Sequence, residues 1–346
     1  MTPVLDASEI KATVPTRVRV ERAVGFGIVA ALVLFLILKL VAEPAAFFTA
    51  LVIGVNQGAL YALVALGYTL VYGIIELINF SHGDLFMLAT VLSGFFVVVW
   101  FGATEMSVTG LLVLLLGLLA AMAVAATINT GAERLAYRRL RRAPKLAPLI
   151  TAVGLSFVYQ FFGIFTNGSG QRNWQTQLGS TGFSIGAVRV PWSLLVVIGV
   201  TVPLLLALSF LIQRTRQGKA MRATAQDQDA ARLMGIDVDR TIAFTFAIGG
   251  ALAGAAGLLY LQTFGTTRYD LGFQLGLIAF TAAVLGGIGN LNGAVLGGFL
   301  IGIIQSMNER FAFGNIWSQS VVFTVLILLM VFKPEGILGR PTTEKV

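Results

Sequence analysis

A short polar stretch between two long apolar runs offers the residues best able to contact a polar solute. It contains Asn79, Ser81, His82, Gly83 and Asp84. The spacing of Ser81 and Asp84 is that of a capping box, in which two side chains bond backbone N–H groups at the start of a helix. Such a start also carries a partial positive charge, which suits a solute carboxylate. A tight turn, with Asp84 as a cap and His82 as an inert hydrogen-bonded residue, would explain the same residues equally well.

A Gly-rich stretch over 286–302 is the second candidate. Its glycines recur every four residues in two series: Gly289, Gly293 and Gly297, then Gly298 and Gly302. This spacing predicts helices that pack closely through small residues. Unwound backbone at membrane depth is tolerated only where it is buried in protein or lines a cavity. We therefore also consider Gly287, Gly289, Asn290 and Asn292 as residues of a solute pathway.

Several kinds of chemistry are excluded by the residue types present. The chain has no cysteine and one histidine, so thiolate catalysis and Cys/His zinc sites are ruled out. It also has no Gly-x-x-x-x-Gly-Lys-Ser/Thr loop for nucleotide phosphates. A hydrolase would need a base beside its nucleophile, and the neighbours Ser81 and His82 have no clear third partner. We expect no enzyme activity, no metal site and no cofactor bound by this chain.

The composition shows which elements must position these residues. Of 346 residues, 57% are hydrophobic and 12% are charged, whereas soluble domains average about 45–50% and about 25%. Apolar runs long enough to cross a bilayer lie near 24–42, 49–75, 83–101, 107–130, 147–166, 191–212, 241–262, 273–288, 291–307 and 317–332. We predict an all-α polytopic membrane protein with about 8–10 transmembrane helices, in which 273–307 either crosses twice or is re-entrant.

Basic residues predict the orientation of these helices. Most of the 24 Lys and Arg residues lie in 1–23, 133–146, 213–240 and 333–346, and cytoplasmic segments carry such an excess. An even number of predicted spans separates each pair of these segments. We therefore expect a multi-pass protein of the cell inner membrane with both termini in the cytoplasm.

The division of the chain follows from the same pattern. We expect a cytoplasmic tail over 1–23, an additional N-terminal transmembrane helix over 24–46, a permease domain over 47–333 and a cytoplasmic tail over 334–346. Small residues after the first apolar run resemble a signal-peptide cleavage site, but the run is long for a signal peptide, so we expect the helix to be retained.

The cytoplasmic segment 213–240 is neither loop-like nor apolar. It is rich in Ala, lacks Pro and has Gly235 where a helix would end. We predict one amphipathic helix over 219–236. Such a helix would rest on lipid or dock in a groove of a cytoplasmic partner, and the pattern by itself favours neither.

Five short segments carry a family resemblance. The chain from 47 to 346 resembles the LivH-type permease subunit of branched-chain amino acid ABC importers. The segments that carry the likeness are 58–63 (GALYAL), 67–75 (GYTLVYGII), 78–83 (INFSHG), 280–289 (FTAAVLGGIG) and 336–341 (GILGRP). The part from Arg222 to Gly235 is similar to that family's ATPase-coupling motif. By this resemblance the coupling residues are Arg222, Ala223, Asp227, Ala231 and Gly235.

The resemblance implies a heteromeric importer that works by alternating access. Its parts would be this chain, a second homologous permease, two ABC ATPase subunits that bind ATP-Mg, and an extracytoplasmic amino-acid-binding protein. A related ABC permease for urea, short amides or another small polar solute would share the fold and is the main alternative. An ion-coupled secondary transporter is less favoured, because its ionisable residues would lie mid-span, whereas those of this chain lie near span ends.

Overall fold

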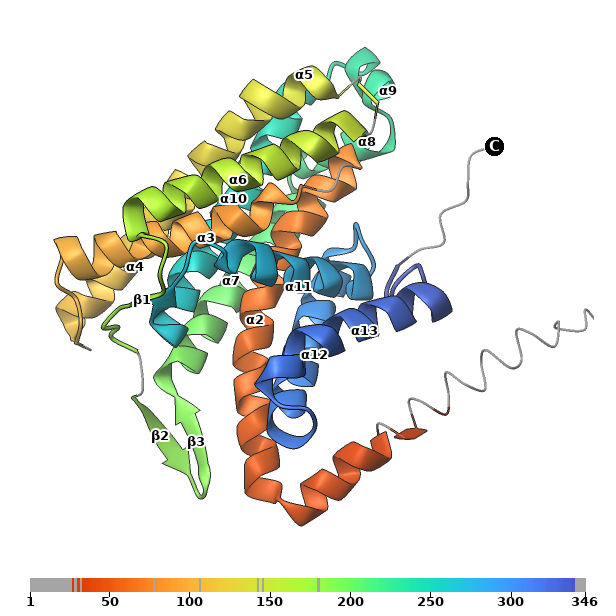
Figure 1. Cartoon of the computed structure of the whole chain (residues 1–346). Coiled ribbons are helices and arrows are strands. Elements are labelled where there is room, and N and C mark those ends of the chain that lie inside the picture. The colour runs from red at the N-terminus through yellow and green to blue at the C-terminus, as the bar shows by residue number, and fades with distance from the viewer. Residues whose placement is uncertain are drawn as a thin grey trace, which may run out of the picture.

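Helices make up nearly all of the described chain. The computed structural model describes residues 27, 30–31, 33–76, 79–105, 107–141, 143–144, 146–178 and 181–339. The predicted tail 1–23 and most of the tail 334–346 lie outside this part. The principal helices are α2 (Pro44–Ile75), α3 (Ser81–Gly94), α4 (Val108–Ala132), α6 (Leu146–Asn167), α7 (Trp192–Arg214), α10 (Val238–Phe264), α11 (Leu271–Gly286), α12 (Leu291–Phe311) and α13 (Ser318–Phe332) (Figure 1).

Shorter elements extend or connect these helices. A π-helix, η1 (Phe95–Trp100), extends α3, and η2 (Glu133–Tyr137) with α5 (Arg138–Leu140) extends α4. The other connecting elements are α8 (Arg216–Gln226), α9 (Gln228–Leu233) and η3 (Asn315–Trp317). The strands β2 (Gly182–Ile185) and β3 (Val188–Pro191) form an antiparallel hairpin, and β1 (Arg172–Asn173) pairs with β4 (Thr266–Thr267).

The predicted polytopic all-α fold is confirmed. Eight helices of the described residues are long and apolar enough to cross a membrane. Of the first helix only Val33–Ala42 is described as a continuous segment, and α11 is shorter than the eight. The 16 residues of α11 correspond to about 24 Å at about 1.5 Å per residue. The predicted segment 273–307 therefore consists of a short helix, α11, followed by a helix of spanning length, α12.

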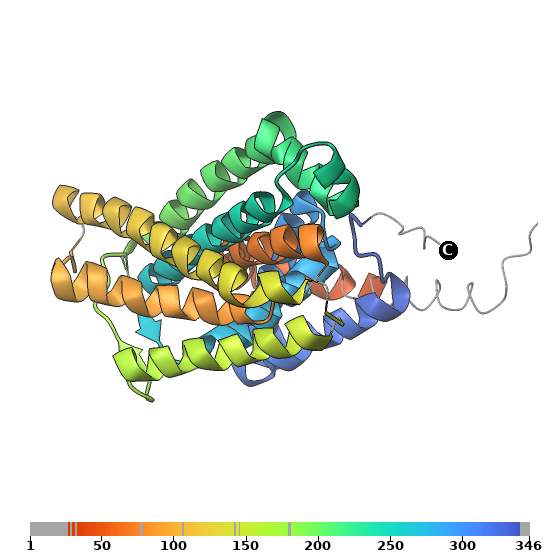
Figure 2. The same cartoon turned by 90° about the horizontal axis from the view of Figure 1, so that it is seen from above.

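The helices differ in how much of their surface is covered. Helices α2 and α10 are buried over most of their length, whereas α4, α6, α7 and α13 present apolar faces outward. Figure 2 shows α6 and α7 at opposite edges, with α10 between them. Outward apolar faces are what lipid requires of the peripheral helices, so α2 and α10 form the centre around which the others pack.

Close packing through glycine joins the two ends of the sequence, as the spacing predicts. One face of α12 packs on α2, where a Cβ at Gly58 would lie 2.7 Å from Phe299 Cα and one at Gly298 would lie 2.6 Å from Ala62 Cα. Another face of α12 carries Gly293 and Gly297 and packs on α11. Because no side chain fits in these contacts, the two glycine series hold α12 against two different helices.

The prediction of one helix over 219–236 is wrong. The segment forms α8 and α9, which are separated by Asp227 in an extended conformation with φ −159° and ψ 115°. Asp227 Oδ1 accepts hydrogen bonds from the backbone N of Asp229 at 2.8 Å and of Ala230 at 2.9 Å. Aspartate is favoured at the N-cap position. Asp227 is therefore both the last residue of the α8 boundary and the N-cap of α9.

Candidate functional site

Asn79 lies in the short link between α2 and α3 and accepts two hydrogen bonds. Its Oδ1 accepts from Ser81 Oγ at 2.6 Å and from the hydroxyl of Tyr137 in η2 at 2.7 Å. Both Asn79 and Ser81 are buried. No side chain caps the start of α3, so the predicted capping box is not formed. The Ser81 hydroxyl instead contributes to a tertiary contact between the link and η2.

Asp84 lies one turn further along α3 and is fully buried. Its carboxylate accepts a hydrogen bond from Ser156 Oγ of α6, and Gln160 Nε2 of the same helix lies 3.3 Å from both carboxylate oxygens. No ion pair of the described residues includes Asp84. A carboxylate held only by neutral donors at membrane depth is costly and typical of a functional position.

His82 and Gly83 place the first turn of α3 against two further helices. The His82 ring meets the Tyr68 ring edge-on at a centroid distance of 4.9 Å and lies beside Gly67 of α2. A Cβ at Gly83 would lie 2.7 Å from Gly276 Cα of α11. The predicted residues over 79–84 are therefore packed among α2, η2, α6 and α11, and their backbone approaches α11 as closely as glycine allows.

The second predicted segment connects α11 to α12 and is held by the C-terminal end of the described chain. Ile337 N donates to Leu285 O at 2.8 Å, and Leu338 N donates to Gly286 O at 3.0 Å. These bonds satisfy carbonyl groups that the end of a helix leaves free. Gly287, with φ +103°, lies against Gly339.

The two asparagines of this segment differ. Asn290 Oδ1 accepts from Gly293 N at 3.1 Å and caps α12, while its Nδ2 donates to Leu338 O at 2.7 Å. Asn292 is exposed, as is Gly289. Asn290 thus has a structural role in the described chain, and Asn292 is free to meet a solute or a partner.

One small cavity brings the two predicted segments together. It has a volume of about 10 Å³ and is lined by Tyr68, Thr69, Tyr72, Asn79, Phe280, Ala283 and Ile288. A space of this size holds about one water molecule. The Asn79 side chain and the turn after α11 therefore meet beside the second half of α2, with no room for an amino acid between them in this conformation. Asp84, Asn290 and Asn292 do not line this cavity.

The predicted coupling residues lie on α8, α9 and the turn that follows. Arg222 donates to Ile212 O at the end of α7, Ala223 is half-buried, and Ala231 is buried. The turn closes with Gly235 N donating to Arg232 O and Ile236 N donating to Ala231 O, both at 3.0 Å. This is a Schellman motif, whose left-handed residue is Gly235 at φ +80°.

This turn exposes an apolar pair at the tip of the segment. Leu233 is 89% exposed and Met234 is 83% exposed. The rigid Schellman turn fixes their position, and they lie on the side of the molecule that carries the Arg-rich connections. An exposed apolar pair on a fixed two-helix motif is suited to contact with another protein.

A charged cluster beside this segment was not predicted as a site. The fully buried Glu133 pairs with Arg141 and lies 3.6 Å from Arg138, while Asp239 at the start of α10 lies 2.6 Å from Arg141. The cluster ties the end of α4 to α10. In the sequence these residues are visible only as charges near span ends, and nothing in their spacing predicts that they meet.

The fold is that of a polytopic membrane protein. A sequence profile described as "Branched-chain amino acid transport system / permease component" matches residues 50–331. The chain therefore belongs to this family of permease components.

The chain is similar along most of its length to two curated permeases. It is 38% identical over 304 residues to the "High-affinity branched-chain amino acid transport system permease protein BraD" of Pseudomonas aeruginosa. This alignment covers 86% of this chain and 97% of BraD. It is 39% identical over 300 residues to the "High-affinity branched-chain amino acid transport system permease protein LivH" of Escherichia coli strain K12. This alignment covers 85% of this chain and 96% of LivH. A shorter match, 31% over 138 residues, is to the "Autoinducer 2 import system permease protein LsrC" of Yersinia pestis, and it covers 38% of this chain and 39% of LsrC.

Proposed function

We propose that this chain is the translocating subunit of an ABC importer that carries branched-chain, aliphatic amino acids into the cytoplasm. The observation that carries the proposal is the match to BraD and LivH, at 38% and 39% identity over 86% and 85% of this chain. Those two proteins are named as permeases of high-affinity branched-chain amino acid transport systems. The likeness spans 97% and 96% of their lengths, so it includes the regions around α3, α9 and α11.

The energy for transport comes, in this proposal, from two separate ATPase subunits that bind ATP-Mg. The sequence has no nucleotide-binding loop of its own. A second homologous permease completes the pathway, and an extracytoplasmic binding protein delivers the amino acid. The chain itself binds no cofactor and is not an enzyme.

The ATPase docks on the tip of the α8–α9 segment. Leu233 and Met234 enter an apolar groove of the ATPase, which is the helix-in-groove mode of recognition. Helix α8 packs against α2, α7 and α10, so a displacement of α8 is transmitted to the two central helices. The coupling residues Arg222, Ala223, Asp227, Ala231 and Gly235 shape the segment that carries this contact surface.

Movement of α2 then opens the pathway. The second half of α2 borders the small cavity between Asn79 and the turn after α11. Separation of the link 79–84 from this turn exposes Asn79, Ser81, His82, Gly83 and Asp84 on one side and Gly287, Gly289, Asn290 and Asn292 on the other. Polar backbone and amide groups in such a path match the ammonium and carboxylate of the solute, while apolar residues accept its side chain.

The Arg-rich ends of the helices face the cytoplasm, and so do both termini. This orientation follows from the charge excess at 133–146 and 213–240. The β2–β3 hairpin then lies on the opposite side of the inner membrane, where the binding protein docks.

Uptake by the reconstituted complex tests the proposal. The complex of both permeases, both ATPases and the binding protein is placed in liposomes loaded with ATP-Mg, and entry of labelled leucine, urea and acetamide is measured. We expect leucine uptake that requires ATP. Uptake of urea or acetamide without leucine would establish the alternative substrate class, and uptake driven by an ion gradient without ATP would overturn the ABC mechanism.

A further inference from the structure

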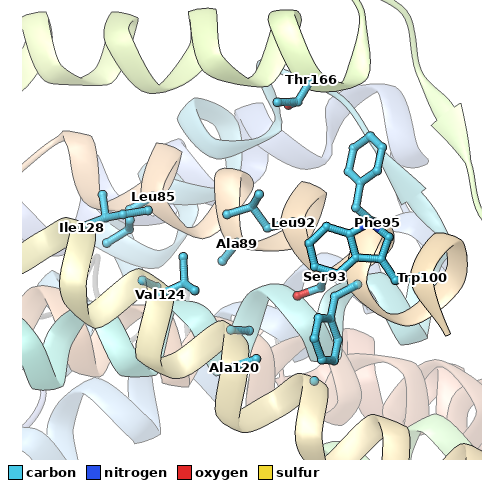
Figure 3. Close-up of a pocket in the computed structure, with 14 residues that line it drawn as sticks. Leu85, Ala89, Leu92, Ser93, Phe95, Trp100, Ala120, Val124, Ile128 and Thr166 are labelled. Atoms are coloured by element: carbon cyan, nitrogen blue, oxygen red, sulfur yellow. The ribbon is translucent and has the colours of Figure 1, made fainter.

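A deep apolar groove runs along α3 and η1 between α4 and α6. It has a volume of about 390 Å³ (Figure 3). Its lining consists of Leu85, Ala89, Leu92, Ser93, Phe95, Phe96, Trp100, Gly117, Ala120, Ala121, Val124, Ala125, Ile128 and Thr166. Helices α4 and α6 each pack against α3 but share no extensive contact with one another. The groove therefore lies over α3 where the two outer helices diverge.

The helices that flank the groove expose large apolar side chains. On α4, Leu116 and Leu119 are 55% exposed, and on α6, Phe161 and Phe165 are 70% and 88% exposed. Large apolar side chains exposed on spanning helices meet acyl chains in a bilayer. A groove between two such faces is accessible to lipid from the side.

The groove is longer than the hydrocarbon region of one leaflet is thick. The lining extends along α3 and η1 from Leu85 to Trp100, which is about 22 Å at about 1.5 Å per residue. One leaflet contributes about half of the roughly 30 Å hydrocarbon core. An acyl chain that enters beside Trp100 and extends through about 15 Å of one leaflet would thus reach the depth of Ala89.

A cationic group stands beside Phe95, one of the residues that line the groove. The guanidinium carbon of Arg172 lies 5.1 Å from the centre of the Phe95 ring and 4.1 Å from that of Trp174. Phe95 lines the groove, and no ion pair of the described residues includes Arg172. Trp100 is 73% exposed, as tryptophan commonly is at the level of lipid headgroups. Arg172 is therefore placed to meet a phosphate whose acyl chain occupies the groove.

We propose that this groove is a binding site for one anionic phospholipid, with an acyl chain against α3 and α4 and its headgroup at Arg172. The bound lipid fills the wedge between α4 and α6 and supports the π-helix η1, which contributes Phe95, Phe96 and Trp100 to the lining. Single π-helical turns are frequent at functional sites.

A photoreactive lipid tests the proposal. The assembled complex is placed in phosphatidylcholine vesicles doped with phosphatidylglycerol that carries a diazirine at the end of one acyl chain. After illumination, labelled peptides are mapped by mass spectrometry. We expect labelling concentrated on the α3 and α4 peptides that line the groove, such as those that contain Ala89 and Val124, above the background on the exposed Leu206 and Phe210 of α7. Labelling spread evenly over all outward-facing helices would overturn the proposal.

Matched variants separate the groove from bulk lipid. Ala120→Phe fills the groove and should reduce labelling of these peptides several-fold, whereas Ala123→Phe, on an exposed part of α4 outside the groove, should not. Val124→Trp serves if Ala120→Phe does not insert. Unchanged labelling in the groove-filling variants, or labelling of the isolated chain that is lost in the assembled complex, would show that the groove is not a lipid site.

Headgroup preference tests the contribution of Arg172. A phosphatidylcholine probe with the same diazirine should label more weakly than the phosphatidylglycerol probe. Arg172→Gln should remove this difference, and Arg189→Gln, which removes the same charge in β3, should retain it. Equal labelling by both probes in the unaltered protein would contradict an anionic site.

Discussion

The hydroxyl of Tyr137 donates a hydrogen bond of 2.7 Å to Oδ1 of Asn79 and so joins the end of α4 to the link between α2 and α3. Both residues are buried. Since Asn79 also accepts from Ser81, removal of the Asn79 side chain leaves two buried donors without this acceptor. The link predicted to line the pathway is therefore also a structural junction, and substitutions there change stability and transport together.

Asn79 and Asn292 differ in what their substitution should do. We expect Asn79→Ala to lower stability by about 1–3 kcal/mol, because two buried donors lose their acceptor. Asn292 is exposed, so Asn292→Ala should leave the thermal midpoint unchanged and, if Asn292 lines the pathway, lower transport per complex. Thermal unfolding and uptake are measured on the same reconstituted complexes. Normal uptake per complex by Asn292→Ala would remove this residue from the pathway.

Asp84 allows the contributions of charge and hydrogen bonding to be separated. Asp84→Ala should destabilise by about 1–3 kcal/mol, because Ser156 and Gln160 lose their acceptor. Asp84→Asn retains an acceptor oxygen and should keep most of the stability. We expect Asp84→Asn to lower uptake per complex through loss of the negative charge. Ser156→Ala removes a donor but not the charge and serves as the control. Uptake that follows stability in all three variants would indicate a purely structural role.

The contact between α2 and α12 should tolerate no side chain. A Cβ at Gly58 would lie 2.7 Å from Phe299 Cα, so Gly58→Ala must separate two helix backbones. Overpacking of this kind costs about 1–3 kcal/mol, and we expect a lower thermal midpoint and less inserted protein. Gly199→Ala in α7 is the control, because a Cβ there meets nothing within 4 Å. Equal midpoints for the two variants would show that α2 and α12 do not pack as described.

Single cysteines test the orientation, and the absence of native cysteine leaves no background. Thr104→Cys and Ser169→Cys lie in connections opposite to the Arg-rich ends. Both should react with a membrane-impermeant maleimide in intact cells. Ala143→Cys and Gln228→Cys should react only after the membrane is opened. Labelling at Gln228→Cys in intact cells would reverse the proposed orientation.

The sequence predicts the helices of this fold more completely than their contacts. Apolar runs locate every spanning helix, because lipid forces backbone hydrogen bonds to form within each segment. Glycine spacing likewise predicts the close approach of α12 to its neighbours. The break at Asp227 is missed, because an Ala-rich segment without Pro or internal Gly favours one helix, and a single N-cap outweighs that preference.

Pairings between distant residues are not visible in the sequence. The contacts of Asn79 with Tyr137 and of Asp84 with Ser156 depend on how α3 is placed among four other elements. Ser81 and Asp84 have the spacing of a local cap, yet the Ser81 hydroxyl bonds the Asn79 side chain and Asp84 bonds Ser156 of α6 instead. Nothing in the sequence predicts that Arg172 lies over the Phe95 ring, because this contact forms only when the connection after α6 folds back over α3.

The apolar tip of the α8–α9 segment gives the most direct test of ATPase docking. Leu233 and Met234 are 89% and 83% exposed and contribute little to the fold. Leu233→Ser with Met234→Ser should therefore leave the permease inserted and its thermal midpoint unchanged, while the ATPase subunits no longer co-purify and uptake is lost. Ile316→Ser is the matched control, because Ile316 is 94% exposed but lies at the opposite end of the helices. Co-purification and uptake that survive the double substitution would place the docking surface elsewhere on the chain.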